Sequence, residues 1–483
     1  MELVMFPVLA LVSTLFLLAL HFIIRTLKER LFGSPNLPPG RLGWPLIGET
    51  PAFFRAGFEA KPEKFIGERM EKYDSRVFKT SLLGKPFAVI SGTAGHKFLF
   101  SNENKLVNLW WPESVRMLFK SALVSVVGDE AKRIRKMLMT FLGLDALKNY
   151  TERIDMVTQQ HIRTYWEGKE EVTVYSTLKL YTFTLACNLF ASINDPERLS
   201  KLGAHFDVFV KGVISLPISI PGTRLYKSMK AANAIREELK LIVRDRKEAL
   251  ERKMASPTQD LLSYLLVDSD TNGRFLSEME ILDNIMLLLY AGHDTSKSSL
   301  TLIMKYLAEM PDVYAKVLQE QLEIANSKKP GELLQWEDVQ KMRYSWNVIS
   351  EVLRLSPPVS SAYRHAIVDF TYEGYTIPKG WQLFTSFGTT HRDPALFPNP
   401  ERFDASRFEG NGPPSYSYIP FGGGPRMCIG YEFARLEMLI FLHNIIKRFK
   451  WDILIPDEHF GYDPLLAPSQ GFPVRLRPHH SRL

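Results

Sequence analysis

The feature that most constrains the fold is a helical pattern that runs unbroken from Ser277 to Met310. Ser277 and Glu280 have the spacing of a capping box, in which two side chains satisfy the free N–H groups at a helix start. Pro311 follows, and proline cannot continue a helix. At a rise of about 1.5 Å per residue, a helix of about 32 residues is about 48 Å long. We therefore predict a helix long enough to cross a whole domain.

One face of this helix changes character near its middle. Leu288, Ala291, Gly292 and Thr295 recur at helical spacing, so the face is apolar, then small, then hydroxylic. Glycine in a helix interior costs about 1 kcal/mol relative to alanine, and close approach of a ligand would offset this. Asp294 places an acid beside the hydroxyl, which makes a short proton relay. A threonine that bonds only to its own helix is the other interpretation, and the pattern alone leaves both open.

A second constrained stretch is the loop from Phe421 to Gly430, which a helical pattern from Tyr431 to Ile446 follows at once. Its three consecutive glycines let the backbone take positive φ and approach a flat partner closely. Cys428 stands near the helix N-terminus, where free N–H groups and the helix dipole favour a thiolate. Arg426 can pair with a carboxylate. Together these residues predict a cradle for an anionic sulfur beside a flat, acidic cofactor.

Three other interpretations of this loop are weaker. A lone cysteine is often only a small buried hydrophobic residue. The glycines suggest a phosphate loop, but no Gly-Lys-Ser/Thr sequence follows them. A disulfide between Cys187 and Cys428 remains open, although two cysteines in 483 residues do not make a disulfide scaffold.

The loop resembles the Phe-x-x-Gly-x-Arg-x-Cys-x-Gly motif of the cytochrome P-450 superfamily of haem-thiolate monooxygenases, and it matches at every fixed position. The resemblance implies a mainly α fold with small β-sheets. It implies that haem b is the cofactor, that Cys428 is the axial ligand of its iron, and that Phe421 and Arg426 bind the haem.

The middle of the long helix is similar to the oxygen-activation motif of the same superfamily. By this resemblance, Gly292, Asp294 and Thr295 are catalytic. Thr295 is expected to hydrogen-bond peroxide on the iron, and Asp294 to supply protons.

Two further motifs follow in the order of the family. Glu351-x-x-Arg354 and Pro400-Glu401-Arg402-Phe403 resemble its Glu-x-x-Arg helix and Pro-Glu-Arg-Phe loop. Glu351, Arg354 and Arg402 are therefore expected to form a buried charge network that braces the haem loop. Taken alone, a helical Glu–Arg pair usually means little.

Two more arginines match positions that bind haem propionates in the family. Arg364 follows a short uncharged segment after two prolines, and its other interpretation is an ordinary surface arginine. Arg135 lies in a basic cluster that is otherwise typical of a solvated helix face or of a surface for an electron donor. The family's tryptophan four residues earlier is replaced by Ala131.

The segments expected near the haem are mostly apolar and offer no cluster of charges to bind a phosphate or an amino acid. These segments include Trp110 and Trp111, and ordinary core packing explains each of these tryptophans about as well as a pocket does. The resemblance implies that the substrate pocket is lined by Trp110, Trp111, Leu288, Ala291, Val359, Ala362 and Leu466.

The N-terminal residues differ in composition from the rest. Leu3 to Ile24 is almost entirely apolar and long enough to cross a hydrocarbon core of about 30 Å. Basic residues follow it, which places the N-terminus in the lumen and the remainder in the cytosol. We predict a membrane anchor with its basic flank at 1–32, a proline-rich hinge at 33–48 and a catalytic domain at 49–483. The expected location is the endoplasmic reticulum membrane, crossed once.

The net charge of +7 and the pI near 9.1 suit an anionic membrane surface or an acidic protein partner. Nucleic acid is disfavoured, because the charges are scattered and no basic run carries interleaved aromatic residues. The loop Ser215–Gly222 contains two prolines and is apolar enough to lie against a membrane or to roof a pocket.

Within the superfamily, Phe98–Leu106 and Arg407–Pro413 resemble plant oxidases of cyclic triterpenoids, the β-amyrin 28-oxidase group. This implies oxidation of a pentacyclic triterpene such as β-amyrin, with O2 and with electrons from NADPH. A separate NADPH–cytochrome reductase is implied, since 483 residues hold no fused flavin domain.

Alternative functions in the same superfamily are hydroxylation of taxane-type diterpenoids or of plant steroids of the brassinosteroid type. A haem-thiolate isomerase or a non-catalytic haem- or lipid-binding protein would not need the acid–hydroxyl relay, so Asp294 and Thr295 argue against both.

Overall fold

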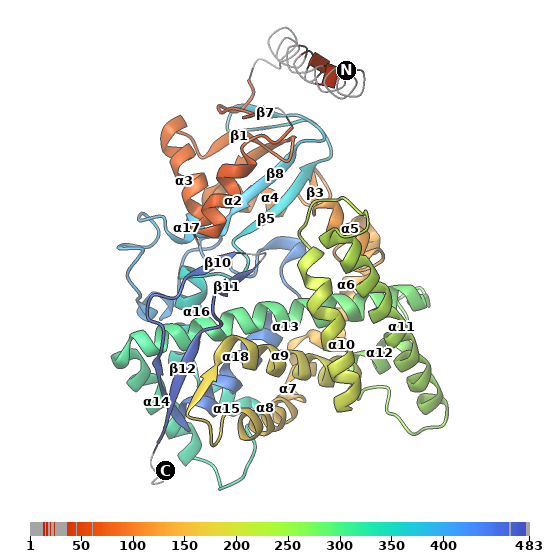
Figure 1. The fold of residues 1–483 in the computed structure, drawn as a ribbon, viewed down its shortest axis with the longest axis vertical. Helices are drawn as coiled ribbons and strands as arrows, with labels where there is room; N and C mark the ends of the chain where they lie inside the picture. Colours follow the sequence, from red (N-terminus) through yellow and green to blue (C-terminus); the bar gives the residue numbers. More distant parts are fainter. Residues whose placement is uncertain are drawn as a thin grey trace, which may run out of the picture.

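The computed structural model describes residues 13, 14, 16, 17, 20, 24, 36–44, 46–59, 61–462 and 465–479. The helix predicted from Ser277 is α13 (Glu278–Glu309), and both halves of its capping box are present. It crosses the molecule between the largest sheet and the helices around α8 and α9 (Figure 1). The prediction of a domain-crossing helix is therefore confirmed.

Other helices surround α13, and three short 3-10 turns join them. They are α2 (Thr50–Phe58), α3 (Pro62–Tyr73), α4 (Gly92–Ser101), α5 (Glu113–Phe119), α6 (Gly128–Leu142), α7 (Leu144–Lys148), α8 (Thr151–Tyr165), α9 (Val174–Ala191), α10 (Pro196–Phe209), η1 (Val210–Gly212), α11 (Arg224–Glu251), α12 (Leu261–Val267), α14 (Pro311–Asn326), α15 (Trp336–Lys341), α16 (Arg343–Leu355), α17 (Phe387–His391), η2 (Ala405–Phe408), η3 (Gly424–Arg426) and α18 (Tyr431–Ile446).

The strands form small sheets at the margins of the helical body. A five-stranded sheet has the order β1-β2-β8-β5-β3, a three-stranded sheet the order β4-β12-β9, and two hairpins are β6-β7 and β10-β11. Their bounds are β1 (Val77–Leu82), β2 (Lys85–Ile90), β3 (Val107–Leu109), β4 (Glu171–Thr173), β5 (Ser361–Ala366), β6 (Phe370–Tyr372), β7 (Tyr375–Ile377), β8 (Gln382–Ser386), β9 (Phe449–Ile453), β10 (Phe460–Tyr462), β11 (Leu466–Pro468) and β12 (Pro473–Pro478).

Two segments of irregular sequence contain short regular elements. The stretch 106–127 contains β3 and α5, and the stretch 460–472 contains the hairpin β10-β11. In this hairpin Phe460 pairs with Pro468 and Tyr462 with Leu466. Short strands of this kind depend on tertiary partners, so local pattern alone does not reveal them.

The membrane span predicted at Leu3–Ile24 lies mostly outside the described residues. Within the part of the chain that the structure describes, no helix is both long and apolar enough to cross a membrane.

The core beside α13 contains one unusual side chain, Glu437 of α18, which is fully buried. Neither carboxyl oxygen makes a hydrogen bond of good geometry with a described residue. Burial raises the pKa of Glu437 from 4.5 to about 8, and the nearby Ser296 hydroxyl opposes only part of this shift. Glu437 is therefore mostly protonated at neutral pH.

This raised pKa makes Glu437 a source of pH-dependent instability. Between the two pKa values the folded chain keeps a proton that the unfolded chain has released, so stability falls as pH rises through that window. Between about pH 5 and about pH 8, we expect Glu437→Gln to reduce this loss of unfolding free energy by about 4 kcal/mol.

Melting temperatures of the purified holoprotein across this pH range measure the effect. Glu432→Gln is the matched control, because Glu432 lies on the same helix but is half-exposed and paired with Arg435. Melting curves of wild type and Glu437→Gln that shift in parallel with pH would contradict the prediction.

Candidate active site

The middle of α13 presents the predicted face to open space. Every residue from Ile281 to Leu289 is buried, and the run is broken at Tyr290, Ala291, Gly292 and Thr295, which are only half-buried. Three of these four residues belong to the face expected from helical spacing. Tyr290 does not share the helical spacing of this face, and Phe119 of α5 and Phe209 of α10 pack on its ring at 5.7 and 5.9 Å.

Protein contacts alone do not require a glycine at position 292. A Cβ added there would lie 3.4 Å from the ring of Phe190 and 3.7 Å from that of Phe433, which is ordinary van der Waals contact. The cost of a glycine in a helix interior therefore has no explanation in packing between protein residues. The expectation that a ligand approaches this position is consistent with that result.

Thr295 and Asp294 do not bond to each other in this structure. The Thr295 hydroxyl donates to the carbonyl oxygen of Ala291 at 2.7 Å, which is the alternative that the sequence left open. Asp294 is 2% exposed and forms a buried ion pair with Lys297, one turn further along α13. Both residues of the predicted relay are thus present, but in this conformation no hydrogen bond joins Asp294 to Thr295.

Lys297 is a site residue that the sequence analysis missed. Burial tends to lower its pKa, but Asp294 and the Tyr175 side chain outweigh burial and raise it, so the ammonium group stays charged. The ammonium nitrogen also lies 4.8 Å from the centre of the Tyr175 ring on α9. The signal available in the sequence was a lysine three residues after an acid inside an apolar helix.

The glycines of the cysteine loop pack against the protein. Gly424 has a φ of +67°, and a Cβ there would lie 2.7 Å from the carbonyl oxygen of Phe100 in α4. A Cβ on Gly423 would lie 2.7 Å from the Phe100 ring. The backbone N–H of Cys428 donates to the carbonyl oxygen of Phe421 at 2.9 Å, which closes the loop. Glycine is required here so that the loop can approach α4.

Both cysteines are free, which excludes the disulfide alternative. Cys187 is buried in α9. Cys428 has solvent-accessible surface, although many protein atoms lie around its sulfur. Burial raises the pKa of Cys428, and the Gly430 N–H and Arg135 offset this only in part. A metal cation beside the sulfur would favour the thiolate form.

Two of the arginines expected to bind haem, Arg364 and Arg426, converge on one acidic residue. The Nε atom of Arg364 lies 2.6 Å from Oε2 of Glu103, and Nε of Arg426 donates to Oε1 at 3.3 Å. Arg426 also donates to the carbonyl oxygens of Leu123 and Val126. Arg135 has no hydrogen-bond or ion-pair partner among the described residues, although it interacts electrostatically with Cys428.

These residues fit a haem with acidic side chains. Arg364 Nε is ion-paired with Glu103, and Arg364 is 4% exposed at the edge of the proposed haem site. Arg135 adds a second cation, one with no hydrogen-bond or ion-pair partner in the described chain. A soft sulfur donor and cations with free capacity are the groups that an iron porphyrin carrying carboxylates would use.

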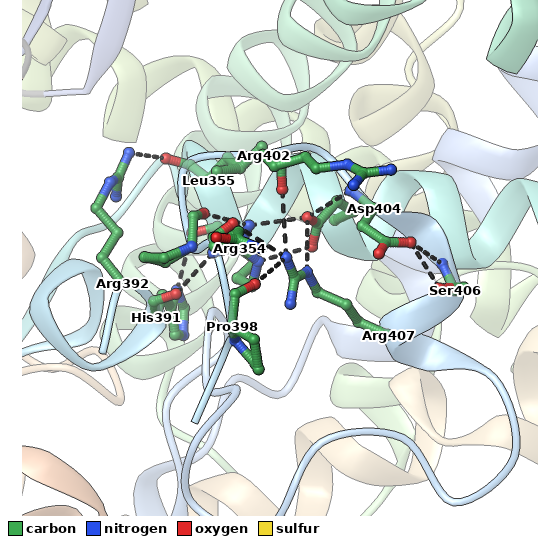
Figure 2. A network of polar contacts seen from close by, with 12 residues as sticks. Arg354, Leu355, His391, Arg392, Pro398, Arg402, Asp404, Ser406 and Arg407 are labelled. Carbon is green, nitrogen blue, oxygen red and sulfur yellow. Dashed lines mark hydrogen bonds and ion pairs between the residues drawn. The ribbon is translucent and has the colours of Figure 1, made fainter. Parts of the chain in front are cut away.

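The expected charge network beside the loop exists, with one residue exchanged. Arg354 forms two hydrogen bonds to Glu351, at 2.7 and 2.8 Å, and both side chains are fully buried. The third member is Arg407, whose Nε lies 3.4 Å from Glu351 (Figure 2). Arg402 is exposed, and its side chain contacts none of these groups, so its prediction is wrong. In Figure 2 the backbone carbonyl oxygen of Arg402 faces Arg407, while the Arg402 side chain points away from it.

The network ties several loops to α16. Arg354 donates to the carbonyl oxygens of His391 and Pro400, both at 2.7 Å, and the backbone N–H of Asp404 donates to Glu351 at 2.9 Å. His391 in turn accepts from the N–H of Ile419, just before the cysteine loop. The position of the loop thus depends on this buried ion pair.

The predicted pocket residues separate into groups. Leu288, Trp111 and Leu466 belong to the main core around α13, and the Leu466 carbonyl accepts a hydrogen bond from Ser298 at 2.5 Å. Trp110 packs instead in a satellite cluster under the sheet, with Phe87 at 5.7 Å. Ala362 and Val359, like Ala291, are half-buried. Phe421 stacks edge-on against Tyr431 at 4.9 Å.

Comparison with known proteins was made on sequence and on structure. Residues 38–461 match the model of the Cytochrome P450 family. A "Beta-amyrin 28-monooxygenase" of Vitis vinifera is 53% identical over 93% of this chain and 93% of that protein. One of Kalopanax septemlobus is 49% identical over 99% of this chain and 100% of that protein. Among solved structures, retinoic acid-bound cyanobacterial CYP120A1 superposes with a TM-score of 0.82 at 34% identity, over 92% of this chain and 100% of that one.

Proposed function

Because the chain belongs to the cytochrome P450 family, we propose that it is a monooxygenase that oxidises a pentacyclic triterpene of the β-amyrin type at carbon 28. The observation that carries the substrate is the identity of about half of all residues, over nearly full length, to several proteins named for that reaction. The family supplies the cofactor, a haem held by a cysteine thiolate, and O2 as the co-substrate.

Haem, when bound, supplies the iron at which O2 is activated, and a thiolate ligand favours cleavage of the O–O bond. Cys428 would hold the iron, while Arg135, Arg364 and Arg426 would face the acidic edge of the porphyrin. Thr295 and Gly292 would lie on the oxygen side, on the accessible face of α13.

Proton movement on the oxygen side requires a change in this structure. The Thr295 hydroxyl has to turn away from the Ala291 carbonyl before it can donate outward from α13. Asp294 is the acid that can return a proton to Thr295, and Lys297 holds the Asp294 carboxylate in place. The ion pair with Lys297 thus controls when Asp294 becomes available.

An apolar, bulky substrate suits the residues on the open side of α13. Phe119, Phe209 and Tyr290 form a largely buried aromatic cluster against the same part of α13, and a charged substrate there would lose its hydration without gaining a partner. Burial of apolar surface contributes about 25 cal/mol per Å². A large hydrocarbon skeleton can therefore bind with one or two polar contacts.

We expect the enzyme to work at the endoplasmic reticulum membrane with a separate NADPH–cytochrome reductase. A hydrocarbon of this size partitions into lipid, and the loop Ser215–Gly222 exposes Leu216, Ile218 and Ile220 by 56%, 49% and 59%. Three exposed aliphatic side chains in one loop are suited to dip into an interface.

The loop contact can be tested in a chain lacking residues 1–30, where the proposed anchor no longer dominates. We expect this chain to float partly with phospholipid vesicles, and Ile218→Asp with Ile220→Asp to abolish flotation, since charges resist insertion. Leu241→Asp, at an exposed aliphatic position on α11, is the control. Equal flotation of the loop variant and the control would exclude the contact.

The substrate is tested by expressing the chain with a plant reductase in yeast and supplying β-amyrin, α-amyrin, lupeol, taxadiene or a brassinosteroid precursor. We expect β-amyrin to shift the haem spectrum, as substrate displaces water from iron, and to gain oxygen at carbon 28. Product from taxadiene or the steroid alone would reject the triterpene assignment.

Two variants separate iron ligation from proton delivery. Cys428→Ser is expected to abolish the red-shifted Soret band of the ferrous carbonyl complex, because a serine oxygen is a poor soft donor. Thr295→Ala is expected to keep that band and substrate binding. It should raise the share of electrons released as peroxide by about tenfold or more, because one proton-transfer group is lost. Unchanged coupling of NADPH to product in Thr295→Ala would refute the relay.

A further inference from the structure

Glu103 occupies an unusual position at the edge of the proposed haem site. It lies in the turn between α4 and β3 and is only 4% exposed. Its two carboxyl oxygens contact Arg364 of β5 and Arg426 of the cysteine loop. One acidic side chain thus joins two arginines that are far apart in the sequence and that both face the cofactor in the proposed site.

The turn holds this carboxylate in a fixed place. The backbone N–H of Leu109 donates to Glu103 Oε1 at 3.0 Å, and Glu103 bridges to Val107. The next residue, Asn104, has a positive φ of 63° and accepts a hydrogen bond from the Gly128 N–H at the start of α6. Helix α6 carries Arg135, so the turn also links Glu103 to the third arginine of the site.

The charges at this edge do not balance within the protein. Glu103 neutralises only part of the charge of Arg364 and Arg426, and Arg135 adds a third cation at this edge, while burial makes unpaired charge costly. His365 is the other titratable group that faces Glu103, and burial lowers its pKa, so it is neutral at pH 7. The two propionates of haem b would supply negative charge that complements these arginines.

We propose that Glu103 is a positioning residue for the haem, which ties Arg364 to Arg426 and sets the number of positive charges left for the propionates. The inference rests on the haem assigned through the family and does not depend on the triterpene substrate. Without the negative charge of Glu103, the environment of the iron becomes more positive, which favours the added electron of the ferrous state. Without its fixed shape, the two arginines lose their common anchor.

Glu103→Gln tests the charge, because glutamine keeps the size of the side chain and its acceptor for Leu109. We expect the substrate-free holoenzyme to show a more positive reduction potential and to transfer haem to apomyoglobin about tenfold faster. The ferrous carbonyl spectrum should keep its thiolate band, which shows that Cys428 ligation is intact. Glu113→Gln, at an exposed position paired with Arg116, is the matched control and should change neither quantity.

Glu103→Asp separates charge from shape. It keeps the negative charge on a shorter chain, so we expect a potential close to that of wild type but faster haem transfer. A Glu103→Gln enzyme with wild-type potential would overturn the proposal, whatever its activity on a triterpene.

Haem loading decides the remaining case. If Glu103→Gln folds without haem while Glu103→Asp loads it, the required group is the charge. If both variants fail to fold, as judged by circular dichroism and melting, Glu103 is structural and the proposal is wrong.

Discussion

A charge buried in this protein must have a partner, and the region around the cysteine loop is arranged by that requirement. Removing one member of a buried ion pair typically costs about 3–5 kcal/mol, because the other charge is left without solvent or a partner. Arg354 and Glu351 are both fully buried and together bind the loops around His391, Pro400 and Asp404. The segment that presents Cys428 is therefore positioned by electrostatics as well as by packing.

The same requirement links the loop to the sheet. Glu103 neutralises part of the charge of Arg364 and Arg426, and these arginines reach it from β5 and from the cysteine loop. Glycines at 423 and 424 permit this arrangement, since a side chain at either position would collide with Phe100. Close backbone packing and charge pairing thus act on the same few residues.

On the opposite side, α13 forms a continuous wall whose middle, from Glu280 to Met304, is buried except at Tyr290, Ala291, Gly292 and Thr295. The ion pair of Asp294 with Lys297 lies within this wall, so the carboxyl group proposed for proton delivery is held in a fixed place. A buried charged group close to the reacting site carries a cost in stability, and such costs are commonly found at functional sites.

Residues that act through their neighbours in the chain could be predicted from the sequence alone. The capping box of Ser277 and Glu280, the helix after Cys428 and the pairing of Glu351 with Arg354 all depend on spacings of three or four residues. The tertiary structure decided the contacts between distant segments. It placed Arg407 where Arg402 was expected and brought Glu103 between two arginines. The physical reason is that helical spacing is a local geometric constraint, whereas the partner of a buried charge or ring is chosen among all segments that the fold brings together.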